Sequence, residues 1–154
     1  MDCYSLVIYK VMPSGNTYNG GKSFRWLKKR WGNLVKGAIL DAGLPSGMGR
    51  IHLVIRYYFT RKCKKRSPEN YPPKLLLDSF ITSNIVIDDN PSYITYIMPF
   101  SDPSTFGFID KSNPRVEIDV YPAMGKALSY GYILNDAGQP VAYGYHLSLE
   151  GQIE

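Results

Sequence analysis

Residues 61–89 combine the residue types that an enzyme acting on a phosphate backbone needs. A basic run is followed by four carboxylates, Glu69, Asp78, Asp88 and Asp89. Cationic side chains neutralise phosphates and release their counterions, whereas carboxylate oxygens hold Mg²⁺ and leave it room for water and substrate. The segment therefore predicts metal-dependent cleavage of a phosphodiester backbone. The basic run is Arg61-Lys62-Cys63-Lys64-Lys65-Arg66.

Each carboxylate also has an ordinary structural interpretation. Lys74 and Asp78 are four residues apart on a predicted helix, so they share a face and could form a salt bridge. Glu69 could be a capping acid, and Asp88 and Asp89 could be a turn pair. Alternatively, Glu69, Asp78 and Asp89 come from a loop, a helix and a strand end, and three such oxygens could converge on one metal ion.

The elements around these residues are predicted from hydrophobic spacing and from proline. Arg50 to Thr60 is β-branched and aromatic, as in a long strand that leads into the basic run. Pro72 and Pro73 favour a helix start, which predicts a helix from Lys74 to about Thr82. Residues 85–87 predict a short buried strand that ends at the Asp88–Asp89 turn.

The rest of the chain predicts one α/β (α+β) domain with a mixed sheet and two main helices. A strand at Leu6 to Tyr9 precedes an amphipathic helix that is capped by Ser23 and stopped by Gly43. Its cations belong either to a solvated face or to a DNA-facing surface. Further strands are expected at 93–98 and 115–121, and a hairpin at 126–149. The cations are Arg25, Lys28, Lys29 and Lys36.

Composition narrows the class of protein. The 154 residues are 44% hydrophobic and 20% charged, which is typical of a globular domain. A net charge of +5 favours an acidic partner, nucleic acid before membrane. Cys3 and Cys63 have neither zinc nor disulfide-framework spacing. The first residues match no signal peptide, so we expect a cytoplasmic protein with no membrane partner.

Several motifs together resemble the RusA-type Holliday junction resolvases, many of them phage-encoded. Arg66-Ser-Pro-Glu-Asn70, Lys74, Asp78 and Asn84-Ile-Val-Ile-Asp-Asp89 are similar to that family's R-D-x-D-N, K, D and G-x-x-x-D-D signature. Upstream, Pro13-Ser14-x-Asn16-x-Tyr18 is similar to its P-S-x-N-x-Y segment. The resemblance covers about residues 4 to 121. It implies a nuclease domain at 1–121, followed by an extension at 122–154 that we expect to be a hairpin on the same domain.

The resemblance implies a homodimer that resolves four-way DNA junctions with Mg²⁺ or Mn²⁺ in a bacterial or phage-infected host. Glu69, Asp78 and Asp89 would be the metal ligands, with Asp88 as a further acid of the site. Lys74 would stabilise the transition state or position the scissile phosphate. Asn70 could cap the second helix and hold Glu69 in place. The implied DNA-binding residues are Asn16, Tyr18, Lys62, Lys64, Lys65, Arg66 and Asn70.

The chain departs from the family pattern at two positions. Ser67 stands at the first acid of the motif, and Glu69 replaces the usual aspartate at the second. Serine carries no charge, so the predicted metal site has about one negative charge fewer. Two alternatives follow, a weakened or inactive relative that binds branched DNA, or a regulatory interaction factor. His52 and His146 are expected to be structural or surface residues.

Overall fold

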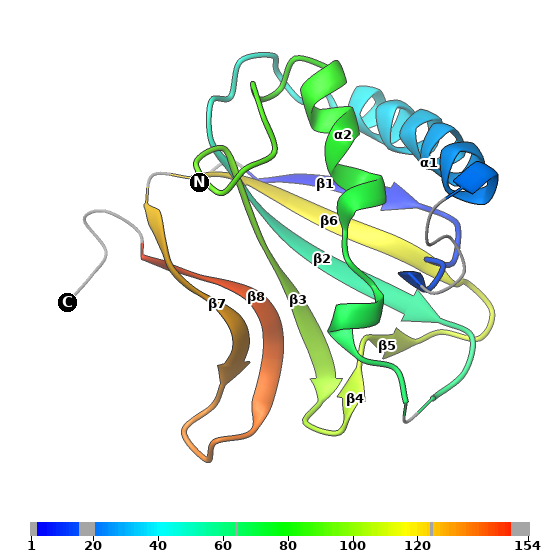
Figure 1. Cartoon of the computed structure of the whole chain (residues 1–154), viewed down its shortest axis with the longest axis vertical. Helices are drawn as coiled ribbons and strands as arrows, with labels where there is room; N and C mark the ends of the chain where they lie inside the picture. Colours follow the sequence, from blue (N-terminus) through cyan, green and yellow to red (C-terminus); the bar gives the residue numbers. More distant parts are fainter. Residues whose placement is uncertain (1–2, 16–20, 64, 124, 149–154) are drawn as a thin grey trace.

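The computed structural model describes residues 3–15, 21–63, 65–123 and 125–148, with no side-chain description for residues 21–23. Figure 1 shows the elements in chain order. They are β1 (Tyr4–Ile8), α1 (Gly21–Ala42), β2 (Ile51–Phe59), the 3-10 helix η2 (Pro68–Asn70), α2 (Lys74–Thr82), β3 (Ile94–Asp102), β4 (Thr105–Phe106), β5 (Phe108–Ile109), β6 (Arg115–Pro122), β7 (Lys126–Leu134) and β8 (Pro140–Ser148).

The strands form one mixed sheet in the order β1-β6-β2-β3-β8-β7, with β4 beside β3 and β5 beside β2. β2 and β3 run parallel, and α2 makes the crossover between them. The other neighbours along this order are antiparallel. Both helices lie on one face of the sheet, and the β7–β8 hairpin extends the sheet beyond them (Figure 1). The predicted single domain with a mixed sheet and two helices is confirmed.

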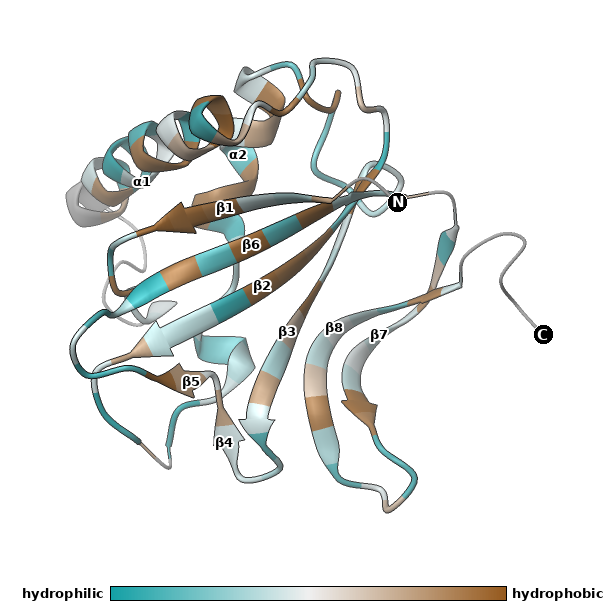
Figure 2. Cartoon of the chain, turned by 180° about the vertical axis from the view of Figure 1, so that it is seen from behind, coloured by the Kyte–Doolittle hydropathy of each residue, from teal (hydrophilic) through white to brown (hydrophobic). Residues whose placement is uncertain are grey.

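The core lies between the helices and the inner face of the sheet. Every second residue of β2, from Ile51 to Phe59, is buried. β6 shows the same alternation, visible as brown and teal bands in Figure 2. Trp31 of α1 and Phe80 of α2 are almost completely buried against these strands. Alternation of this kind leaves the outer face of the sheet to polar side chains.

The segment after α2 is a helix stop and not the predicted strand. Asn84 has a φ of 59°, and the backbone N–H groups of Ile85 and Val86 both donate to the carbonyl oxygen of Phe80. A left-handed residue followed by such a bond closes the end of a helix. Ile85 and Val86 are therefore buried without joining the sheet, while Ile87 is 77% exposed. The apolar run at 85–87 was consistent with both a buried strand and a helix end, because hydrophobic periodicity alone does not distinguish such short segments.

Other boundaries agree more closely. α2 has the predicted ends, and Gly43 has a φ of 70°, as a helix stop requires. α1 already begins at Gly21, so Ser23 lies within the helix and the predicted N-cap there is wrong. The predicted hairpin consists of β7 and β8, and β8 joins the sheet through β3. Within the described residues, no helix has the length and apolar content needed to cross a membrane.

Candidate active site

A groove between α1 and α2 holds a carboxylate among lysines. Asp78 points from α2 towards α1, where its carboxylate lies 3.0 Å from the ammonium nitrogen of Lys28. The groove has a volume of about 410 Å³, and Lys29 and Lys36 also line it. Ser79, one residue after Asp78, donates a hydrogen bond of 3.0 Å to the carbonyl oxygen of Gly32 and fixes the spacing of the helices. The site therefore offers both signs of charge to a ligand.

Lys74 lies one helical turn before Asp78 but has a different partner. Its ammonium lies 4.6 Å from the centre of the Phe24 ring of α1. A cation over an aromatic face keeps its charge and its exposure to solvent. The structure therefore shows Asp78 paired with Lys28 and not with Lys74. Lys74 remains an exposed cation close to α1.

The Asp88–Asp89 turn adds two more carboxylates. One oxygen of Asp88 accepts the backbone N–H of Asp89 at 2.7 Å, and the other accepts the Asn90 amide at 3.2 Å. Partial burial, a hydrogen bond with Asp88, and the charges of Asp88 and Asp78 raise the pKa of Asp89. The charge of Asp78 therefore acts on the carboxylate of Asp89. Like charges gathered in this way favour a cation between them.

Glu69 lies in η2 and interacts with the C-terminal hairpin. Its carboxylate accepts a hydrogen bond of 2.8 Å from the hydroxyl of Tyr132 in β7. Burial, together with Glu69, raises the pKa of Tyr132 to about 12, so the phenol is a neutral donor at pH 7. Glu69 is not among the described charges that raise the pKa of Asp89. Asp88 and Asp89 thus share one turn and the charge of Asp78 acts on Asp89, whereas Glu69 has a different neighbour.

The described carboxylates do not form a three-ligand metal cage. Among the described residues, no group of three or more His, Cys, Asp or Glu side chains is arranged to hold a metal ion. Mg²⁺ is commonly bound by one or two carboxylates, with water and substrate phosphates completing its six ligands. Asp78 and Asp89 suit that mode, whereas the predicted set of Glu69, Asp78 and Asp89 is not assembled.

The basic run is only partly available to a ligand. Lys62 and Lys65 are exposed. The guanidinium of Arg66 instead lies 3.8 Å from the centre of the Phe59 ring and donates to the carbonyl oxygen of Arg61 at 2.9 Å. Arg66 therefore has a structural role at the end of this segment. Lys64, together with Asn16 and Tyr18, lies outside the described residues.

Asn70 does not cap α2 as predicted. Its side-chain amide donates to the hydroxyl of Ser67 at 3.3 Å. The residue before α2 is Pro73, and no side chain caps that end. Proline removes a donor at the helix start, so the need for a cap there is smaller. Asn70 instead bridges the ends of the turn that contains Glu69.

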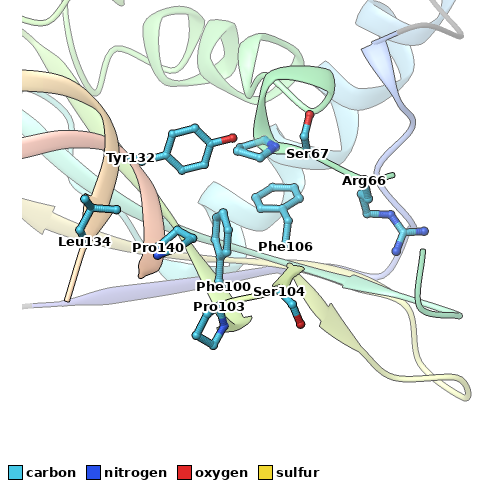
Figure 3. A pocket seen from close by; sticks show the side chains of 10 residues that line it. Arg66, Ser67, Phe100, Pro103, Ser104, Phe106, Tyr132, Leu134 and Pro140 are labelled. Carbon is cyan, nitrogen blue, oxygen red and sulfur yellow. The ribbon is translucent and has the colours of Figure 1, made fainter. Parts of the chain in front are cut away.

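A second hollow lies on the other side of Glu69, between residues 66–68, the β3–β4 turn and the β7–β8 hairpin. It has a volume of about 550 Å³, and the rings of Phe100, Phe106 and Tyr132 line it (Figure 3). Tyr132 is thus shared between this hollow and the Glu69 carboxylate.

A scan of protein-family models and a search of curated proteins found no match to this chain. The site must therefore be judged from its geometry. Sequence reasoning missed two partners, Lys28 for Asp78 and Tyr132 for Glu69. The basic face of the first helix was a signal for Lys28. No sequence signal pointed to Tyr132, because it lies 63 residues from Glu69 and meets it only through the fold.

Proposed function

We propose that this chain is a structure-selective DNA endonuclease that resolves four-way junctions as a homodimer by Mg²⁺-dependent hydrolysis. The observation that carries the proposal is the groove between α1 and α2, where Asp78 lies among Lys28, Lys29 and Lys36. Cations beside a carboxylate suit a phosphate backbone and the metal ion bound to it. The motifs that resemble the RusA-type resolvases support a four-way DNA junction as the substrate.

The roles of the side chains follow from their positions. Lys28, Lys29 and Lys36 would pair with phosphates along the groove. Asp78 and Asp89 would hold Mg²⁺, and Asp88 would keep the turn that presents Asp89. When bound, the ion would polarise the phosphodiester and lower the pKa of a water molecule. Lys74, an exposed cation one turn from Asp78, would hold the scissile phosphate and stabilise its added negative charge.

A second candidate is a protein that binds branched DNA without cutting it. Three observations favour it: the serine at position 67, the engagement of Glu69 by Tyr132, and the lack of a three-ligand group among the described residues. In this case the lysines of the groove would govern affinity, and the carboxylates would not matter.

A cleavage assay on a synthetic four-way junction separates the two candidates. The parent protein should produce paired nicks with Mg²⁺ or Mn²⁺, and it should shift the same junction in a gel that contains EDTA. Asp78→Asn and Asp89→Asn should each reduce cleavage by more than about 100-fold, since even the outer partners of metal ligands commonly account for 10- to 100-fold. Binding in EDTA should be unchanged or tighter in both variants.

Asp41→Asn is the matched control, because Asp41 is an exposed aspartate at the end of α1 and outside the groove. It should cut like the parent protein. Binding without cutting by the parent protein would select the second candidate. A parent protein that neither cuts nor binds the junction would remove both candidates.

A further inference from the structure

The hollow shown in Figure 3 is built from aromatic rings on three separate segments. Phe106 of β4 is buried and meets Phe100 of β3 edge to face, with ring centres 5.4 Å apart. Phe100 also meets Tyr132 of β7, with ring centres 6.2 Å apart. Leu134, two residues further along β7, is 55% exposed at the rim. These contacts give the hollow apolar walls that exist before any ligand arrives.

Tyr132 is held in place although its ring is half exposed. Its accessible fraction is 49%, and its hydroxyl donates to Glu69 at 2.8 Å. The hydrogen bond ties the hairpin to η2 across the hollow, which fixes the orientation of the ring. A positioned, partly exposed aromatic face is what stacking of a planar ligand requires.

The rim of the hollow carries positive charge. Arg66, the last residue of the basic run, is part of its lining. Arg61, Lys62 and Lys65 are exposed on this segment. Hydrogen bonds from Ser104 lower the pKa of Asp102 at the end of β3, and the charge of Lys62 adds to this effect. Lys62 therefore acts on the β3–β4 turn at the rim. A ligand in the hollow would therefore have cations next to it.

We infer that this hollow binds an unpaired nucleobase of a single-stranded nucleic-acid segment, with Tyr132 as the stacking surface and Arg61, Lys62 and Lys65 on the flanking phosphates. Aromatic faces beside a basic strip form the usual surface for single strands, because every base has a π-face and every linkage a charge. A volume of about 550 Å³ lies within the ordinary range for ligand sites. The inference shares with the proposed function only the choice of nucleic acid as ligand.

The test uses the full chain and two fluorescein-labelled strands of equal charge, a thymidine decamer and a decamer with the same backbone but abasic sugars. Fluorescence anisotropy should show tighter binding of the thymidine strand by about 5- to 150-fold, as expected for stacking of one base. Tyr132→Leu should remove this preference and leave the affinity for the abasic strand unchanged. Tyr132→Phe loses the hydrogen bond to Glu69 but keeps the ring and its contact with Phe100, so it should keep most of the preference.

Tyr9→Leu is the matched control, because Tyr9 is a tyrosine exposed by 71% that follows β1 and lies outside the hollow. It should retain the preference, and thermal melting should confirm that all variants fold. Equal binding of both strands by the parent protein, or an unchanged preference in Tyr132→Leu, would overturn the inference. The inference would also be overturned if the parent protein showed no base preference and a proline-rich peptide displaced both strands. That result would assign the hollow to a peptide. Loss of junction cleavage would leave the base preference as it is, so the two proposals fail separately.

Discussion

The ion pair between Lys28 and Asp78 contributes little to the stability of the fold. Their side chains are 53% and 41% exposed, and exposed pairs contribute only about 0.2–1 kcal/mol. Neither partner is therefore committed to the fold. A phosphate could pair with the Lys28 ammonium, and a cation could bind the Asp78 carboxylate. Both exchanges would cost little free energy, because each new interaction replaces one of similar strength.

His52 makes the free energy of unfolding depend on pH. Its Nδ1 lies 2.7 Å from the Thr95 hydroxyl, and burial, reinforced by Arg50, lowers its pKa from 6.5 to about 4. The unfolded chain thus binds a proton more readily than the folded chain. The free energy of unfolding should fall as the pH decreases from about 6.5 to 4, by at most about 3 kcal/mol from this residue.

Urea unfolding at pH 7.5, 5.5 and 4.5 measures this effect. His52→Asn keeps a polar group near Thr95 but does not titrate, so its stability should change less over this range. The difference between the two proteins isolates His52 from the carboxylates that also titrate. Parallel loss of stability in both proteins would show that His52 is not the responsible group.

At the scale of elements, the β7–β8 hairpin depends on two glycines that face each other. Gly131 pairs with Gly144, and their φ values are 144° and 143°, a region that other residues rarely adopt. A Cβ at Gly144 would overlap the backbone carbonyl of Tyr96, whereas a Cβ at Gly131 meets nothing within 4 Å. Gly144 therefore lets β8 lie close against β3, whereas Gly131 is needed only for its backbone conformation.

The two glycines allow a matched comparison. Gly131→Ala should lower the free energy of unfolding by about 1–3 kcal/mol through its backbone conformation alone. Gly144→Ala adds overlap with β3 and should cost about 1–3 kcal/mol more. Urea denaturation of both variants is the measurement. Equal losses would mean that the hairpin moves away from β3 without cost.

The accuracy of sequence reasoning differed between elements for physical reasons. α2 was located to the residue because prolines and an apolar face mark it locally, and the hairpin because turn residues separate two strands. The segment 85–87 was misassigned because Asn84 closes the helix and leaves the apolar residues to cover its end. β4 and β5, of two residues each, are too short to show a period.

The candidate site was predicted in the same uneven way. The charge of Asp78 acts on Asp89, as can happen between helix and loop positions close in the chain. Glu69 was assigned to them by motif alone, and its contact with Tyr132 depends on strand order across the whole sheet. Such long-range pairs have no local signal.

For the whole molecule, positive charge is unevenly distributed. On the outer face of the sheet, Arg56 pairs with Glu117 and Asp119, and Arg115 pairs with Glu117 and Asp110. These charges largely cancel. α1 carries six basic residues and one acidic residue, so the helix layer holds much of the net +5. We therefore expect a polyanion to approach from the helix side.

The salt dependence of DNA binding tests this orientation. The double variant Lys28→Gln/Lys29→Gln should weaken binding to all sequences alike and reduce the slope of log K against log salt by roughly 2. Filter binding or anisotropy from low to moderate salt gives the slope. The pair Lys111→Gln/Lys126→Gln changes two exposed lysines outside the groove and should leave the slope nearly unchanged. The reverse order of effects would place the DNA on another surface.

The position of β6 also sets the order in which the chain can fold. β1 ends at residue 8 and pairs with β6, whose last residue is 122, and β6 also covers one edge of β2. On the ribosome, at 5–20 residues per second, β1 would wait about 6 to 23 s for its partner. During that interval the apolar side of β2 would be exposed next to an open strand edge. The nascent chain therefore passes through a stage that is prone to aggregation and suited to chaperones.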